Sequence, residues 1–150
     1  MLLDTDVPLL PDTECRATLV KLHTPTYPIG MSLKSDERFP KSVRLVSPLD
    51  FDRVFLEGVV ASDSVLVVHA ARGKQTWTRI GLSVSKRVGN SPIRNRWKRL
   101  IREAFRRQKV ELPIGIDMVV RPKRGAVPDQ DLIFKSLLKL ALQLDRKLKA

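Results

Sequence analysis

The sequence has 150 residues, 43% of them hydrophobic, which is enough for one domain with a modest core, and no apolar run reaches the roughly 18 residues of a membrane helix. Its single cysteine, Cys15, excludes an internal disulfide and a thiolate zinc site, and we expect a cytoplasmic protein. The formal net charge of +12 indicates a polyanionic partner, either a nucleic acid or an acidic membrane face.

Residues 1–37 differ in charge from the rest of the chain. They hold three basic and six acidic side chains, a net charge of −3, so the remaining residues carry +15. Asp4 and Asp6 stand where a secretory signal would be basic, so we expect no signal peptide. Four prolines and the lack of an apolar period predict a mostly disordered, mildly acidic extension; a short docked segment is the alternative. The folded domain is predicted over residues 38–150.

The first predicted helix begins at residues 47–50, SPLD, with serine as N-cap, proline at the first helical position and an acid two residues later. Gly58 ends it. Residues 64–71 and 77–85 are rich in β-branched side chains and predict two strands. A short strand near residues 59–60 precedes this pair.

The second half of the chain predicts two more helices and one more strand. Residues 89–92, GNSP, begin a helix that closes at Leu112-Pro113, and residues 116–121 form a strand. Pro128 opens the last helix, whose first turn carries two aspartates and whose end is basic, as the helix dipole favours. The order α-β-β-β-α-β-α predicts an α/β (α+β) two-layer sandwich, with a sheet of about four strands and three helices.

Residues 91–108, SPIRNRWKRLIREAFRRQ, predict a basic amphipathic helix. Its apolar stripe consists of Ile93, Trp97, Leu100, Ile101, Ala104 and Phe105. The opposite face gathers polar and basic side chains, namely Asn95, Arg96, Arg99, Arg102 and Arg106, with Lys98 at its flank. One acid, Glu103, stands against ten lysines and arginines over residues 86–109, so nothing nearby in sequence is expected to neutralise this face. Guanidinium groups grip phosphate, which favours a nucleic-acid partner over a merely solvated face that would mix both signs.

Two further features suit RNA. Lys86 and Arg87 lie just before the start of the basic helix, close to free backbone N–H groups that attract phosphate. Phe51 and Phe55 are four residues apart and share one face of the first helix. They are either core residues or partly exposed platforms for unpaired bases, where stacking contributes about 1–3 kcal/mol per base. The sequence leaves both alternatives open.

The run over residues 81–106, GLSVSKRVGNSPIRNRWKRLIREAFR, resembles the signature of the bacterial ribonuclease P protein family. Segments around Arg44, residues 50–55 and residues 117–122 also resemble that family, so the likeness spans about residues 38–148. The chain departs from the family pattern at three positions. Ser91 replaces a usual alanine, Trp97 replaces a usual aliphatic residue, and Val67 stands where relatives often have an aromatic, which weakens base stacking there.

The resemblance implies the protein subunit of ribonuclease P, which assists a catalytic RNA in removing the 5′ leader from precursor tRNA. It also implies a left-handed β-α-β crossover, as in ribosomal-protein-like domains, where general rules favour a right-handed one. A basic surface would bind the catalytic RNA, one protein per RNA, through Lys86, Arg87, Asn90, Arg94, Asn95, Arg96, Lys98, Arg99, Arg102 and Arg106. A cleft between the first helix and the sheet would take the leader of precursor tRNA, lined by Arg44, Phe51 and Phe55.

The acidic residues of the domain show no metal-ligand spacing, and several sit in first turns of helices, where they have structural explanations. His23 lies in the extension, and His69 falls within a strand as a packed or edge residue. We therefore predict no catalytic residue and no metal or cofactor bound by the protein, with Mg²⁺ held by the RNA. A structural RNA-binding protein, such as a ribosome component, is the alternative. A membrane binder is disfavoured because both apolar helices are needed to cover the sheet.

Overall fold

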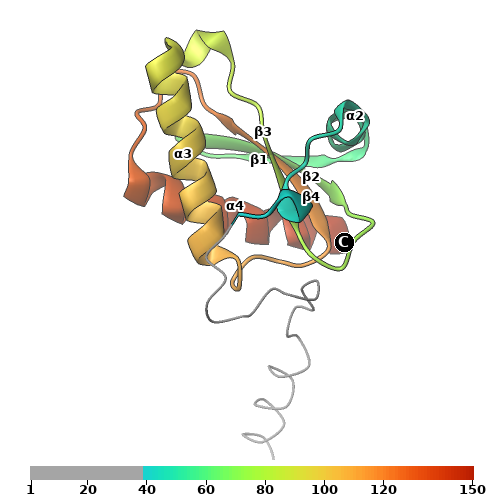
Figure 1. Ribbon diagram of the computed structural model, residues 1–150. Coiled ribbons are helices and arrows are strands. Elements are labelled where there is room, and N and C mark those ends of the chain that lie inside the picture. The colour runs from blue at the N-terminus through green and yellow to red at the C-terminus, as the bar shows by residue number, and fades with distance from the viewer. Residues whose placement is uncertain (1–38) are drawn as a thin grey trace, which may run out of the picture.

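The computed structural model describes residues 39–150, and the predicted extension over residues 1–37 lies outside them. Figure 1 shows how helices and strands alternate along this part of the chain. The elements are η1 (Lys41–Val43), α2 (Pro48–Glu57), β1 (Val59–Ser62), β2 (Leu66–Arg72), β3 (Arg79–Leu82), η2 (Lys86–Val88), α3 (Ser91–Gln108), β4 (Ile116–Pro122) and α4 (Gln130–Lys149). Setting aside the two short 3₁₀ turns, η1 and η2, the predicted order α-β-β-β-α-β-α is confirmed.

The four strands form one mixed sheet in the order β1-β2-β4-β3. β2 runs antiparallel to both β1 and β4, whereas β3 runs parallel to β4. Because α3 connects β3 to its parallel neighbour β4, the chain contains the β-α-β unit that the family resemblance implies. The left-handed sense of this crossover stays a prediction from the resemblance.

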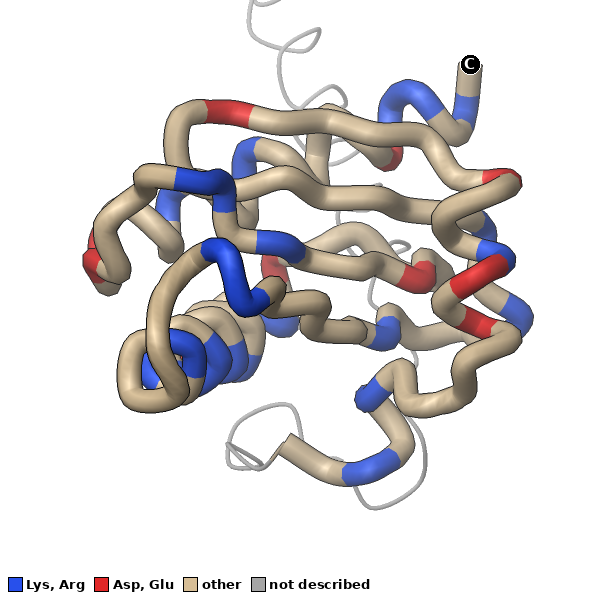
Figure 2. The backbone as a smooth tube through the Cα atoms, turned by 90° about the horizontal axis from the view of Figure 1, so that it is seen from above, with Lys and Arg blue, Asp and Glu red and all other residues tan. Residues whose placement is uncertain are grey.

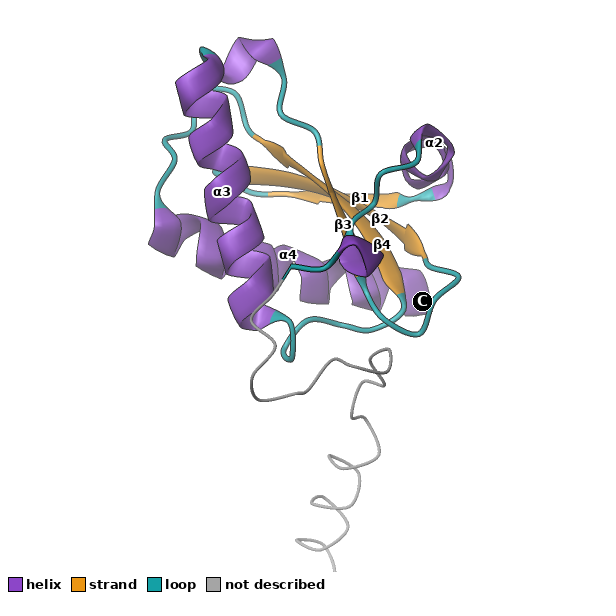
Figure 3. Ribbon diagram, in the orientation of Figure 1, coloured by secondary structure: helices purple, strands orange, loops and turns teal. Residues whose placement is uncertain are grey.

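The two faces of the sheet are covered to different extents, as Figure 3 lets the reader follow. Alternate residues of β2 and β4, among them Val68 and Val120, are fully buried in one large core with side chains of α3 and α4. The residues between them face the other way. There, α2 covers only one end, where Ala71 and Val119 join a smaller buried cluster. The rest of that face has no helix on it, which leaves room for a ligand.

Several element boundaries differ from the prediction, with the largest differences at the ends of β3 and α3. The strand predicted over residues 77–85 is shorter, because the chain turns into η2, where the Ser85 hydroxyl accepts a hydrogen bond from the Arg87 backbone N–H at 3.0 Å. α3 ends at Gln108, before the predicted stop at Leu112-Pro113. The Gln108 carbonyl accepts backbone N–H groups from two later residues, at 2.8 and 3.0 Å, which closes the helix in a turn.

α2 begins and ends where the sequence predicts. Ser47 occupies the N-cap position, although its side chain makes no capping hydrogen bond. Gly58 ends the helix with φ −78°, so it is not needed for a left-handed turn. A Cβ at Gly58 would lie 2.1 Å from the Val54 carbonyl oxygen and 2.8 Å from that of Ala70. Glycine is therefore required here by the close approach of α2 to β2.

Candidate RNA-binding surfaces

α3 is fixed to the sheet by a side-chain cap and an apolar side. The Asn90 side chain accepts a hydrogen bond from the Ile93 backbone N–H at 3.3 Å, which satisfies one of the free donors of the first turn. Four residues of the predicted stripe are fully buried, namely Trp97, Ile101, Ala104 and Phe105. Leu100 is half-buried, and Ile93, in the first turn, is 38% exposed. The stripe is therefore confirmed over its central and C-terminal part.

The opposite side of α3, called here the cationic face, consists of Asn95, Arg96, Lys98, Arg99 and Arg102. All are exposed except Lys98, which is half-buried. Figure 2 shows α3 nearly end-on, with basic residues banding the helix and the adjacent η2 turn. Asn95, Arg96 and Arg99 line a shallow groove of about 530 Å³ at the start of the helix. Within residues 39–150, the ion pairs leave Arg96, Arg99 and Arg102 free for an external polyanion.

The C-terminal end of α3 behaves differently from its start. Glu103 pairs with Arg106 at 2.6 Å and with Arg107 at 2.7 Å. The hydrogen bond from Arg106 is the main cause that holds the pKa of the Glu103 carboxyl below its ordinary value. The expectation that no nearby acid neutralises the helix is therefore wrong at this end. The predicted role of the half-buried Arg106 in RNA binding stays a prediction.

The predicted residues next to the cationic face occupy supporting positions. Asn90 uses its side-chain oxygen as the helix cap, and half-buried Arg94 donates to the Ser91 hydroxyl at 3.0 Å. Lys86 and Arg87 are exposed on η2, and their contact with phosphate stays a prediction.

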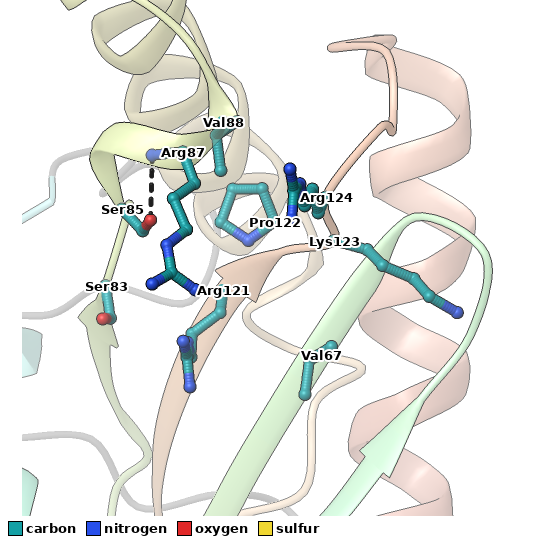
Figure 4. A pocket seen from close by; sticks show the side chains of 9 residues that line it. All are labelled: Val67, Ser83, Ser85, Arg87, Val88, Arg121, Pro122, Lys123 and Arg124. Atoms are coloured by element: carbon teal, nitrogen blue, oxygen red, sulfur yellow. Dashed lines mark hydrogen bonds between the residues drawn. The ribbon is translucent and has the colours of Figure 1, made fainter.

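A second basic site, called here the basic pocket, lies between η2 and the end of β4. It has a volume of about 260 Å³, and its lining includes Arg87, Arg121, Lys123 and Arg124. Figure 4 shows the Arg87 side chain reaching toward Arg121, while Lys123 points away from both. The Lys123 ammonium donates to the Asp63 carbonyl at 3.0 Å, which explains that direction. Of the three guanidinium groups in the lining, those of Arg87 and Arg121 lie toward each other and can face a bound anion together.

Sequence reasoning missed Arg121, Lys123 and Arg124. The signal was present, because three basic residues fall within residues 121–124 at the end of a predicted strand. Strand alternation alone places Arg121 on the face opposite Val120. Its meeting with Arg87 depends on the parallel pairing of β3 with β4, where the Ser83 backbone N–H donates to the Val120 carbonyl at 3.1 Å.

The two phenylalanines of α2 divide between the two alternatives that the sequence left open. Phe51 is half-buried against the small cluster under α2, and its ring lies on β3 where Gly81 has no side chain. Phe55 is 38% exposed. Their ring centroids are 6.5 Å apart with planes at 39°. Phe51 is therefore largely a packing residue, and Phe55 is the better placed of the two to meet a base.

Phe55 also contacts the sheet through His69. The two rings meet edge to face, with centroids 4.9 Å apart and planes at 74°. Half-burial of the ring lowers the pKa of His69, and the positive charge of Arg121 lowers it further. Of the two predicted alternatives for His69, a packed or an edge residue, the structure shows the packed one, because β2 lies inside the sheet and the ring contacts Phe55. The His69 ring extends the aromatic surface of Phe55 across β2. We call Val67, His69, Ser83 and Arg121, the uncovered residues of this side, the open sheet face.

The two predicted surfaces meet at a pocket beside α3. Arg44 and Phe51 line it from one side, and Lys98 and Arg102 from the other, around a volume of about 260 Å³. The Arg44 guanidinium lies 5.0 Å from the centroid of the Phe39 ring and donates to the Phe39 carbonyl at 2.9 Å. The predicted cleft residues are thus split, with Arg44 and Phe51 at this junction and Phe55 on the open sheet face.

Several acidic residues of the described part have structural partners. The Asp129 carboxylate accepts the Leu132 backbone N–H at 3.0 Å, so α4 begins at Gln130 with Asp129 as cap rather than at Pro128. Asp50 pairs with Arg79 at 3.2 Å. Over residues 39–150, no three histidine, cysteine, aspartate or glutamate side chains gather as a metal site would require.

None of the helices in residues 39–150 is both long enough and apolar enough to cross a membrane.

Comparisons with known proteins agree with this geometry. The model of the family "Ribonuclease P" matches residues 39–145. The ribonuclease P protein component of Brevibacillus brevis is 41% identical over 86 residues, covering 57% of this chain and 68% of that protein. The one from Finegoldia magna is 37% identical over 110 residues, covering 71% and 91%.

Solved structures give the same assignment. The RNase P protein of Staphylococcus aureus is 30% identical with a TM-score of 0.61, and the match covers 71% of this chain and 97% of that one. The RNase P protein of Thermotoga maritima is 32% identical with a TM-score of 0.60, covering 69% and 96%. This chain therefore belongs to the ribonuclease P protein family, the protein subunits of a tRNA-processing ribonucleoprotein endoribonuclease.

Proposed function

We propose that the open sheet face, together with Phe55 of α2, holds the 5′ leader of precursor tRNA, while the cationic face of α3 binds the RNA subunit of ribonuclease P. The protein then favours precursor over mature tRNA, because only the precursor carries a leader. The observation that carries this proposal is the continuity of one uncovered surface, which runs from the Phe55–His69 ring pair to the basic pocket at Arg121 and Arg87.

The binding of a single strand needs two kinds of contact, and this surface offers both. Bases stack on aromatic rings whatever their identity, and the backbone follows positive charge. His69 and Arg121 lie on adjacent strands, because β2 and β4 pair His69 with Val119 and Val67 with Arg121. A strand of unpaired nucleotides could therefore place a base against Phe55 and a phosphate between the two arginines.

The cationic face of α3 suits a structured RNA. Its arginines extend from a helix whose other side is buried, so the backbone positions that carry them are fixed before binding. The helix itself therefore loses little conformational freedom on contact. Guanidinium groups bind phosphate through paired hydrogen bonds. We place the RNA subunit here, with one protein per RNA, and we place the complex in the cytoplasm.

In this division of labour the protein performs no bond cleavage. Its residues neutralise phosphate, order the RNA subunit and retain the leader, and the Mg²⁺ needed for hydrolysis is held by RNA. The protein's own contribution to substrate choice is then a difference in affinity between precursor and mature tRNA.

Reconstitution of the protein with its RNA subunit tests the proposal. Phe55→Ala should reduce the affinity for precursor tRNA by about fivefold to a hundredfold, the equivalent of one stacked base, and leave mature tRNA unchanged. Leu56→Ala is the matched control, since Leu56 is the next residue on α2 and is 85% exposed. Equal affinity of the holoenzyme for precursor and mature tRNA would contradict leader binding. Cleavage by the protein without RNA would contradict the division of labour.

A further inference from the structure

The helix that carries Phe55 is only thinly anchored by apolar contacts. Within α2, Val54 is the one fully buried side chain. The cluster beneath it contains only Leu45, Ala71 and Val119 besides Val54, with Phe51 packed at its margin. Such a small contact leaves a ten-residue helix free to roll about its axis unless something else fixes it.

A network of four charged side chains supplies that second attachment. Asp117 of β4 is fully buried, and Arg79 of β3 grips it with Nε at 2.8 Å from Oδ1 and Nη2 at 2.7 Å from Oδ2. Arg53 of α2 donates to the same carboxylate. A second link has the cation on the sheet and the anion on the helix, because Arg79 Nη1 donates to Asp50 Oδ2 of α2 at 3.2 Å. The helix and the sheet thus each contribute one cation and one anion.

This network lies on the opposite flank of α2 from the aromatic rings. At about 100° per residue, Phe51 and Phe55 point roughly 60° and 100° to one side of Val54, whereas Asp50 and Arg53 point roughly 40° and 100° to the other. Val54 is therefore the contact on which the helix rests. A rotation that lifted the charged flank would move both rings relative to the sheet.

The chemistry of the network suits a role in orientation more than in stability. A buried ion pair recovers little net free energy after desolvation, and well-packed apolar residues often replace it without loss. What charge-assisted hydrogen bonds add is direction, because a guanidinium and a carboxylate meet in a fixed plane. The hydrogen bond with Asp117 is the main cause that raises the pKa of Arg79.

We infer that Asp50, Arg53, Arg79 and Asp117 form a clamp that sets the angle of α2, and thereby positions Phe55 for the leader. These four are positioning residues and touch no substrate. The inference rests on the proposed leader binding. It adds that the preference for precursor tRNA depends on a buried charge network which lies across the sheet from α3.

The test uses the reconstituted holoenzyme with Arg53→Met and Asp50→Asn, singly and together. The double variant removes the Arg53 hydrogen bond and the charge that Asp50 presents to Arg79. It leaves Asp117 paired with Arg79, so no buried charge on the sheet loses its counterion. Asp52→Asn is the matched control, because Asp52 lies on the same helix and is exposed. Three substrates are compared, namely precursor tRNA with a long leader, precursor with a one-nucleotide leader, and mature tRNA. Affinity for the RNA subunit and hydrogen exchange of the free protein are measured alongside.

The double variant should lose fivefold or more of its affinity for the long-leader precursor, about the effect of one stacked base. KM for that substrate should rise while kcat stays unchanged, and the other substrates and the RNA subunit should bind as before. Amide protection should fall in α2 and persist in α3. The single variants should show part of each change, which keeps the test informative if the double variant folds poorly.

Retention of the long-leader preference to within twofold would overturn the clamp. So would an equal loss of affinity for the RNA subunit, or a defect that persists with the one-nucleotide leader, because either means general damage to the fold. If Phe55→Ala also has no effect on the precursor, leader binding itself fails. If Phe55→Ala has its expected effect and the clamp variants are silent, the clamp alone is wrong.

Discussion

The two helices that carry the candidate RNA contacts are attached to the sheet in opposite ways. α3 has 18 residues and buries three large apolar side chains and one alanine, whereas α2 has ten residues and fully buries one side chain. α3 is held by the apolar surface that it buries against the sheet and α4, and its cations extend outward from this fixed helix. α2 is held by a small apolar contact and four charges. The comparison teaches that the surface proposed for the RNA subunit rests on a large apolar contact, whereas the surface proposed for substrate choice depends on a few directional contacts.

The largest expected effect comes from removing the apolar support of α3. Trp97 is fully buried, so Trp97→Ala should lower the free energy of unfolding by about 3–5 kcal/mol, as for other large-to-small core changes. Both RNA surfaces should be lost together, because α3 and the sheet share this core. Urea denaturation followed by circular dichroism measures the change. Ile93→Ala on the exposed first turn is the control and should cost less than about 1 kcal/mol.

A smaller effect, confined to the α2 side, is expected from Gly81. A Cβ at this position would lie 2.7 Å from Phe51 Cζ and 3.2 Å from Leu45 Cβ, so Gly81→Ala must displace the ring. We expect a loss of about 1–3 kcal/mol in unfolding free energy, typical of overpacking, and weaker binding of precursor tRNA. Affinity for the RNA subunit should not change.

A double-mutant cycle sharpens this prediction. Phe51→Leu in the Gly81→Ala background makes room for the new methyl group, so the two changes should be less harmful together than their sum. Unfolding free energies of the four proteins give the coupling. Strict additivity would mean that the ring does not rest on Gly81.

The same contrast decides what the sequence reveals. The cationic face of α3 follows from a 3.6-residue period within one uninterrupted helix, so residues 91–108 were enough to predict it. The open sheet face joins residues from α2, β2, β3 and β4, and their meeting depends on strand order and register, which local patterns do not contain. Arg121 and Lys123 were therefore missed, and His69 was predicted only to be packed. The clamp was invisible for the same reason, since Arg53 and Asp117 are 64 residues apart.

The charges of α3 should be visible in the salt dependence of RNA-subunit binding. If Arg94, Arg96, Lys98, Arg99 and Arg102 each neutralise a phosphate, the logarithm of the binding constant should fall with that of the salt concentration with a slope of about −4 to −5. Arg96→Ala or Arg99→Ala should each flatten the slope by about one unit. Arg107→Ala is the matched control, because Glu103 already pairs with Arg107. A flat salt response of the unsubstituted protein would rule out the cationic face as the RNA contact.

The smallest expected effect is a difference between the two regions in how they respond to pH. The open sheet face contains a histidine, the side chain whose ordinary pKa lies nearest to neutral, whereas α3 contains none. His69 on the open sheet face should respond, because burial and the charge of Arg121 lower its pKa below the ordinary 6.5. The unfolded chain then binds a proton at a higher pH than the folded chain does.

The sign of this effect follows from proton linkage. The contribution of neutral His69 to stability is fully present above about pH 6.5, is lost as the pH falls from there through the folded-state pKa, and changes no further below it. His69→Gln should therefore remove part of the pH dependence of the unfolding free energy between pH 6.5 and pH 5, and run parallel to the unsubstituted protein above pH 7. His23 is present in both proteins, so a titration of its own is the same in each and cancels in the difference. Identical pH profiles for the two proteins would mean that His69 keeps an ordinary pKa and is more open to water than its contact with Phe55 implies.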